Sequence, residues 1–129
     1  MNNSDKQFLD LLNRTITDLK VASNQQLERI ADLELYRAEF LNNLNEVTLA
    51  EEAYDSIWNQ YDSMPNLKWI VAESIYRLAE IKAQEGENET AIVLYKAAEV
   101  TYKPIIGTMK QVAQKRIKEI GQRVARLKP

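Results

Sequence analysis

The stretch Tyr76–Glu99, YRLAEIKAQEGENETAIVLYKAAE, decides the fold of this 129-residue chain. Alanine-rich helical patterns stand on both sides of a single glycine, Gly86. Because glycine readily takes the left-handed conformation that closes a helix, the pattern predicts a turn between two helices here. Small residues on both helices would let the two axes approach more closely than Leu or Phe permits. They are Ala79 and Ala83 on the first helix and Ala91, Ala97 and Ala98 on the second. The stretch therefore predicts an antiparallel helical hairpin.

Helix starts are indicated elsewhere by Ser or Thr followed three residues later by Glu or Gln, the spacing of a capping box. Asparagines after Pro65 and after Gly86 add two further caps. The predicted caps are Ser4, Ser23, Thr48, Asn66, Asn88 and Thr108. Six helices are then expected, at 5–22, 24–46, 49–63, 67–85, 89–102 and 109–127. Short connections make successive helices antiparallel, so the predicted class is all-α. Without the break at Ser23, the first two helices would form one long rod.

The residue composition excludes several classes of protein. Hydrophobic residues make up 45% of the chain and charged residues 28%, which is typical of a folded soluble protein. The length favours a single domain over residues 1–129. The chain has no Cys and no His, which removes thiolate chemistry, the commonest general base and the commonest metal ligand. We therefore predict no catalytic residue, no cofactor and no metal site, and expect that the protein is not an enzyme.

The sequence also bears on location. The beginning, MNNSDKQFLDLLNRTITDLK, lacks the basic start and the following apolar run of a secretory signal. No later window is apolar enough to span a bilayer. A cytoplasmic protein that does not associate with membranes is therefore expected.

The hairpin resembles a tetratricopeptide repeat, a unit of about 34 residues in two antiparallel helices whose copies stack into a solenoid. Residues at the family's mutual spacing are Leu78, Ala79, Gly86, Ala91, Tyr95 and Ala98. Ile75 and Lys82 replace the usual Trp and Tyr, and Pro104 lies one residue beyond the usual closing proline. The clear match covers about 72–105, with a fainter copy upstream.

This resemblance implies a short α-solenoid with three parts. N-terminal helices would occupy residues 1–46, tetratricopeptide-like hairpins 47–105 and a basic capping helix 106–129. An unrelated helical bundle is the alternative architecture, because degenerate repeats and ordinary bundles share the same helical patterns.

The resemblance also implies a binding face, because in this family the first helix of each hairpin lines the concave surface where ligands lie. The residues at those positions are Glu73, Tyr76, Glu80, Ala83 and Gln84. The two carboxylates would repel the terminal carboxylate of a peptide and suit a basic or amphipathic helical segment. A non-enzymatic protein-interaction module is therefore expected: an adaptor, assembly factor or chaperone-like subunit that holds a protein or peptide partner. Alternatively, these residues are only solvated helix positions.

The last part of the chain is strongly basic. Residues 101–129 hold eight Lys or Arg and one acidic residue, Glu119. The whole chain has 17 basic and 19 acidic residues, so residues 1–100 hold nine basic and eighteen acidic ones. A basic helix can neutralise phosphates or lie on an anionic membrane. We expect instead that it covers the end of the last hairpin, because it carries an apolar stripe suited to a core. The stripe consists of Met109, Val112, Ala113, Ile117, Ile120, Val124 and Leu127.

Two other functions stay open beside the interaction module. The basic C-terminal helix could bind nucleic acid or an anionic surface, and such binding would weaken steeply with added salt. The opposite charges of the two parts could also attract within one chain or between copies, which would suit a self-assembling structural subunit and a homo-oligomer. A size that depends on protein concentration would identify that third function.

Overall fold

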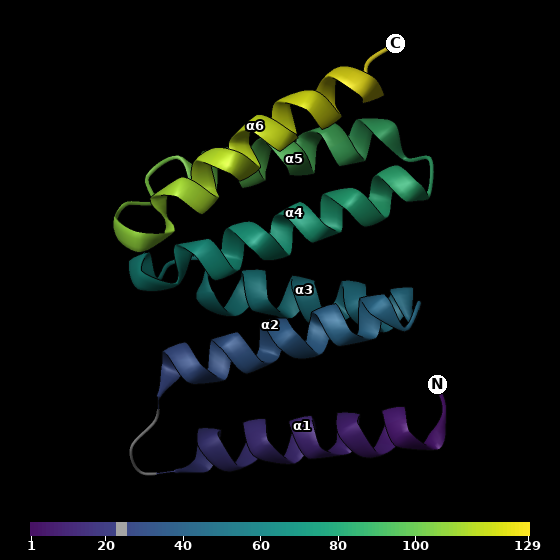
Figure 1. Cartoon of the computed structure of the whole chain (residues 1–129), viewed down its shortest axis with the longest axis vertical. Coiled ribbons are helices and arrows are strands. Elements are labelled where there is room, and N and C mark those ends of the chain that lie inside the picture. The colour runs from purple at the N-terminus through teal and green to yellow at the C-terminus, as the bar shows by residue number, and fades with distance from the viewer. Residues whose placement is uncertain (23–25) are drawn as a thin grey trace. The chain divides into compact units, whose positions relative to one another are not determined.

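The computed structural model describes residues 1–22 and 26–129, and these residues form six α-helices and two short 3-10 helices with no strand (Figure 1). The 3-10 helices Pro65–Leu67 and Gly107–Met109 directly precede the fourth and sixth α-helices. The α-helices are α1 (Asn3–Val21), α2 (Leu27–Asn43), α3 (Val47–Tyr61), α4 (Lys68–Gln84), α5 (Asn88–Tyr102) and α6 (Lys110–Leu127). The predicted all-α class of helical hairpins is confirmed, and every helix lies within a few residues of its predicted range.

The helix caps differ from those predicted. The cap of α1 is Asn2, whose side chain accepts a hydrogen bond from the Asp5 amide at 2.8 Å while the Asp5 carboxylate accepts one from the Asn2 amide at 3.2 Å. Ser4 therefore lies inside α1. Several polar residues cluster at each start, so the Ser/Thr spacing alone does not decide which residue is the cap. The other predicted caps also lie inside a helix or a 3-10 helix and not before one. They are Thr48, Asn66, Asn88 and Thr108.

Ser23, the predicted cap of the second helix, falls outside the described residues. The predicted separation of the first two helices is nevertheless confirmed, because α1 ends at Val21 and α2 begins at Leu27. In Figure 1 the two helices run in opposite directions.

The predicted turn at Gly86 is confirmed. Gly86 has a φ of 80°, and its amide and that of Glu87 bond to carbonyls in the last turn of α4 at 3.1 and 2.9 Å. This pattern closes a helix at a left-handed residue. Asn45, with a φ of 63°, closes α2 in the same way. Each turn leaves three residues between its helices, so the chain reverses sharply at both places.

The chain divides into two compact units, Met1–Ala53 and Tyr54–Pro129, with the boundary inside α3. In the first unit α1 packs on α2, and Leu12 and Ile16 are the buried residues of α1. The Phe8 ring meets the Phe40 ring edge-on, with 5.0 Å between the ring centroids. Burial of these apolar groups supplies the favourable free energy that holds the two helices together.

In the second unit α4 is the most buried helix, with ten of its 17 residues inside the core. It packs closely with α5, and α6 packs on α5 and runs antiparallel to it (Figure 1). Ala79, Ala91 and Ala98 are completely buried, whereas Ala97 is only half-buried. This burial agrees with the prediction that small residues allow close packing in the hairpin.

Replacing Ala91 or Ala98 with Leu is expected to lower the free energy of unfolding by ~1 to 3 kcal/mol, because a filled core must move to admit the added methyl groups. Both alanines have 0% exposure. Thermal denaturation followed by circular dichroism would measure the loss. Ala97→Leu is the control and should cost less, since Ala97 keeps contact with solvent. Unchanged stability in both test variants would contradict close packing of this hairpin.

Candidate partner-binding site on α4

All five predicted partner-binding residues lie on α4, at spacings of three, four or one residue that put them along one side of the helix. Glu73 and Tyr76 are buried, with exposed fractions of 6% and 0%. Glu80 and Ala83 are partly exposed, and Gln84 is exposed. Whether these residues bind a partner stays a prediction. Within the chain, side chains of α6 already contact three of them, as the hydrogen bonds described next show.

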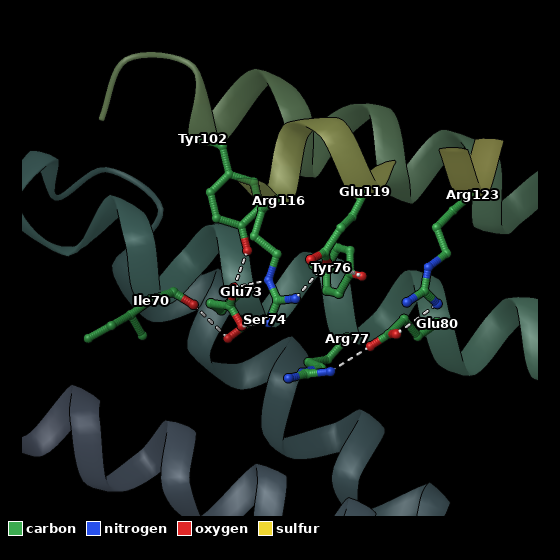
Figure 2. A network of polar contacts seen from close by, with 10 residues as sticks. All are labelled: Ile70, Glu73, Ser74, Tyr76, Arg77, Glu80, Tyr102, Arg116, Glu119 and Arg123. Atoms are coloured by element: carbon green, nitrogen blue, oxygen red, sulfur yellow. Dashed lines mark hydrogen bonds and ion pairs between the residues drawn. The ribbon is translucent and has the colours of Figure 1, made fainter. Parts of the chain in front are cut away.

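The Glu73 carboxylate is the centre of a hydrogen-bonded network (Figure 2). Arg116 of α6 donates to both of its oxygens, from Nε at 2.6 Å and from Nη2 at 3.1 Å. The Tyr102 hydroxyl donates to the same carboxylate at 2.5 Å. A paired guanidinium and carboxylate with two parallel hydrogen bonds is among the stronger polar contacts in proteins. Glu73 is therefore buried with its charge balanced.

Tyr76 lies beside this ion pair. The Arg116 guanidinium stands over the Tyr76 ring, 4.4 Å from its centroid, at a distance that permits a cation–π interaction. Glu119 accepts a hydrogen bond from Arg116 at 2.9 Å and another from the Tyr76 hydroxyl at 3.2 Å. Arg116 thus joins two carboxylates and an aromatic ring, and it fixes the middle of α6 against α4.

A second ion pair stands two turns further along. Arg123 of α6 donates to Glu80 at 3.1 Å, and Arg77 donates to the other oxygen of Glu80 at 2.7 Å. Glu73 and Glu80 are seven residues apart, as are their partners Arg116 and Arg123. Seven residues make about two turns of an α-helix. The two helices therefore run parallel, with cations on one matched to carboxylates on the other.

The protonation states of the network are set by burial and by its own charges. Burial raises the pKa of Tyr76 to about 12, and the charge of Glu80 adds to that rise. Burial, followed by the charge of Glu73, raises the pKa of Tyr102 well above its usual value. Burial alone would raise the pKa of Glu119, but the Arg116 and Tyr76 hydrogen bonds hold that pKa below its usual value. Both phenols are therefore neutral and Glu119 is charged near pH 7, as the hydrogen bonds among them require.

An open pocket of about 220 Å³ lies where α6 passes the C-terminal end of α4. Three of the five predicted residues line it. The pocket therefore leaves part of the predicted binding face accessible while α6 is in place. Its lining consists of Glu80, Ala83, Gln84, Tyr95, Arg123, Arg126 and Leu127.

The predicted apolar stripe of α6 is buried at its centre. Ile120 has 0% exposure and Ala113 has 3%, while Ile117, Val124, Met109 and Leu127 are half-buried. Val112 departs from the prediction, since it is 45% exposed. The C-terminal helix therefore packs on the hairpin of the second unit.

The sequence prediction missed the partners of the site: Tyr102, Arg116, Glu119 and Arg123. One signal could have indicated two of them. Arg116 and Arg123 repeat the seven-residue spacing of Glu73 and Glu80 with opposite charge, and such matched spacing is typical of ion pairs between neighbouring helices.

Comparison with protein-family models, with curated proteins and with solved structures found no match. Within residues 1–22 and 26–129, no three acidic side chains lie close enough together to hold a metal ion. In the same residues, no helix combines the length and the apolar character needed to cross a membrane. Function must therefore be argued from the α4–α6 contact and the pocket beside it.

Proposed function

We propose that this protein is a non-enzymatic interaction module of tetratricopeptide-like hairpins that holds a partner segment along α4, as an adaptor, assembly factor or chaperone-like subunit. One observation carries the proposal: α4 binds a basic amphipathic helix, α6, through the matched pairs Glu73–Arg116 and Glu80–Arg123. A surface that holds one such helix has the charge and shape to hold another.

The hairpin itself supports the tetratricopeptide-like assignment. Its packing alanines are completely buried, and Gly86 has the left-handed conformation at the turn. Tyr95, at the family's aromatic position, is 1% exposed and meets the Tyr76 ring edge-on, with 5.7 Å between centroids. The buried alanines, the turn at Gly86 and the packed Tyr95 ring support the tetratricopeptide-like proposal.

A partner could enter at the pocket beside the C-terminal end of α4. Ala83 is partly exposed and Gln84 is exposed, and both line the pocket beside Leu127. An apolar side chain from a partner could enter there, since about 150 Å³ is enough for a benzene ring. A pocket that combines apolar side chains with a few polar groups is typical of a ligand-binding site.

The test is capture of partners from nuclease-treated native lysate by the whole chain and by two variants, followed by mass spectrometry. Ala83→Lys puts a bulky cation into the pocket and should remove the captured partner while leaving Glu73 and its contacts intact. Val93→Lys is the matched control, because Val93 lies on α5 with 66% exposure. Capture of the same proteins by all three chains would contradict a binding site at this end of α4.

Binding to nucleic acid or an anionic surface is the second candidate, because one side of α6 leaves its cations in solvent. The exposed cations are Lys110, Lys115, Lys118, Arg126 and Lys128. Phosphate binding by several cations weakens steeply as salt is added, whereas docking of a partner helix in a groove does not. Capture that disappears after nuclease treatment, or that falls about 500-fold between 50 and 200 mM salt as five phosphate contacts would give, would favour this second function.

A further inference from the structure

The contact between α6 and the rest of its unit is poor in buried apolar residues. Only Ala113 and Ile120 of its 18 residues are buried. Ile117, Val124 and Leu127 are half-buried, and the ion pairs of Arg116 and Arg123 complete the attachment, with the Arg123 side chain 41% exposed. Ion pairs that reach solvent contribute little to stability. The helix is therefore docked at defined positions but held by few buried groups.

The contact between α6 and α4 also leaves space at one end. The pocket of about 220 Å³ lies between α6 and the end of α4, and it is bordered by Ala83, Tyr95 and Leu127. A helix with larger apolar side chains at the level of Leu127 would bury more surface there than α6 does. Because burial of apolar surface is favourable, such a helix would bind this end of α4 more tightly than α6 does.

We propose, on the basis of the interaction function above, that α6 is an exchangeable occupant of the side of α4 that carries Glu73 and Glu80. The sequence of α6 then indicates the chemistry of the partner. The partner is a basic amphipathic helix with two arginines seven residues apart and an aliphatic residue four positions after the first, as in Arg116, Ile120 and Arg123. The arginines pair with Glu73 and Glu80, and the aliphatic residue takes the place of Ile120. The partner binds by replacing α6.

Tethering gives α6 an advantage over any free helix. A segment joined by a short linker has an effective concentration of about 1 mM at its own site. The linker here is short, since α5 ends at Tyr102 and α6 begins at Lys110. A free peptide of the same sequence therefore competes poorly, and weakening the resident helix should increase binding of the free one.

The experiment uses the full chain and a fluorescent peptide of residues 107–129, with binding measured by anisotropy. The chain carries either the native residue or Arg123→Gln, which removes one ion pair of α6 while Glu80 keeps its contact with Arg77. The peptide should bind the Arg123→Gln chain about two- to fivefold more tightly than the native chain, as expected when an exposed ion pair of the tethered competitor is removed.

Two peptide variants of equal net charge separate recognition from general attraction. Arg116→Gln with Arg123→Gln in the peptide should abolish binding, whereas Lys115→Gln with Lys118→Gln should leave it within about twofold, because those lysines are exposed. Equal loss with both peptides would overturn the proposal, since attraction would then be unspecific.

Hydrogen exchange on the native chain tests the replacement without any variant. Excess peptide should speed exchange of the α6 amides several-fold while the α4 amides keep their protection. No peptide binding to either chain, or unchanged exchange of α6, would overturn the replacement and leave α6 a permanent cover. The proposed function would survive that result if Ala83→Lys still removed a captured partner. Exchange of α6 only between two copies of the chain would also overturn the proposal, because a second copy would then be the occupant.

Discussion

Replacing Ile120 with Asp is expected to lower the free energy of unfolding by ~3 to 5 kcal/mol, because the change removes a buried apolar side chain and puts a charged carboxylate in its place. Ile120 has 0% exposure, and it stands between the two arginines that pair with α4. Thermal or urea denaturation followed by circular dichroism would measure the loss. The expected loss of stability is large because residue 120 is fully buried, so water cannot solvate the new charge.

The control for this prediction changes charges on the outer side of the same helix. Lys115, Lys118 and Arg126 are exposed, and their joint replacement with Gln should alter stability by less than ~1 kcal/mol. A melting temperature indifferent to Ile120→Asp would show that α6 is not packed in solution. The exposed cations would then make the basic helix the functional element of the protein.

Replacing Glu73 with Gln is expected to cost ~2 kcal/mol, because it removes the charged acceptor of Arg116 and leaves the guanidinium paired with Glu119. The Glu73 and Arg116 side chains are 7% and 21% exposed. The Tyr102 hydroxyl would also lose its charged acceptor. Equilibrium unfolding in urea would measure the loss, and Glu89→Gln, at an exposed position of the first turn of α5, should cost almost nothing.

A double-mutant cycle then isolates the pair itself. Arg116→Met keeps much of the side-chain volume and removes the charge, so the double variant Glu73→Gln with Arg116→Met should be clearly more stable than the sum of the two single losses predicts. Replacing both partners of a buried pair is commonly far less costly than removing one. Strict additivity would mean that Glu73 and Arg116 do not interact in solution.

The hairpin could be predicted from the sequence because its signals are local. Gly86 ends α4, and Ala91 and Ala98 lie within about two turns of α5, so neighbouring residues decide both features. The caps were predicted less well, because Asn2 with Asp5 competes with Ser4 for the start of α1. Such local competition is decided by energies of about 1 kcal/mol, which residue types alone do not resolve.

The candidate binding face could be predicted only as a set of positions on one helix. Its spacing along α4 follows from helical geometry, but its occupation by α6 depends on residues 43 positions away in the chain. A contact of that kind is decided by how the helices pack, which no local pattern reports. The division of the chain into a single domain with three parts, and the roles of the five site residues, stay predictions.

The parallel run of α4 and α6 limits where α6 can stop along its neighbour. A slip of one turn, about 5 Å, would bring Arg116 from Glu73 to the level of Tyr76 and Arg77, so that one cation would face another. A slip of two turns would restore one ion pair, with Arg116 at the level of Glu80, and would leave Arg123 beyond the end of α4 at Gln84. Intermediate positions are thus penalised by repulsion and distant ones by a lost pair. The spacing of four charges consequently fixes the axial position of the helix to a single setting, which the sparse apolar contacts of α6 could not do alone.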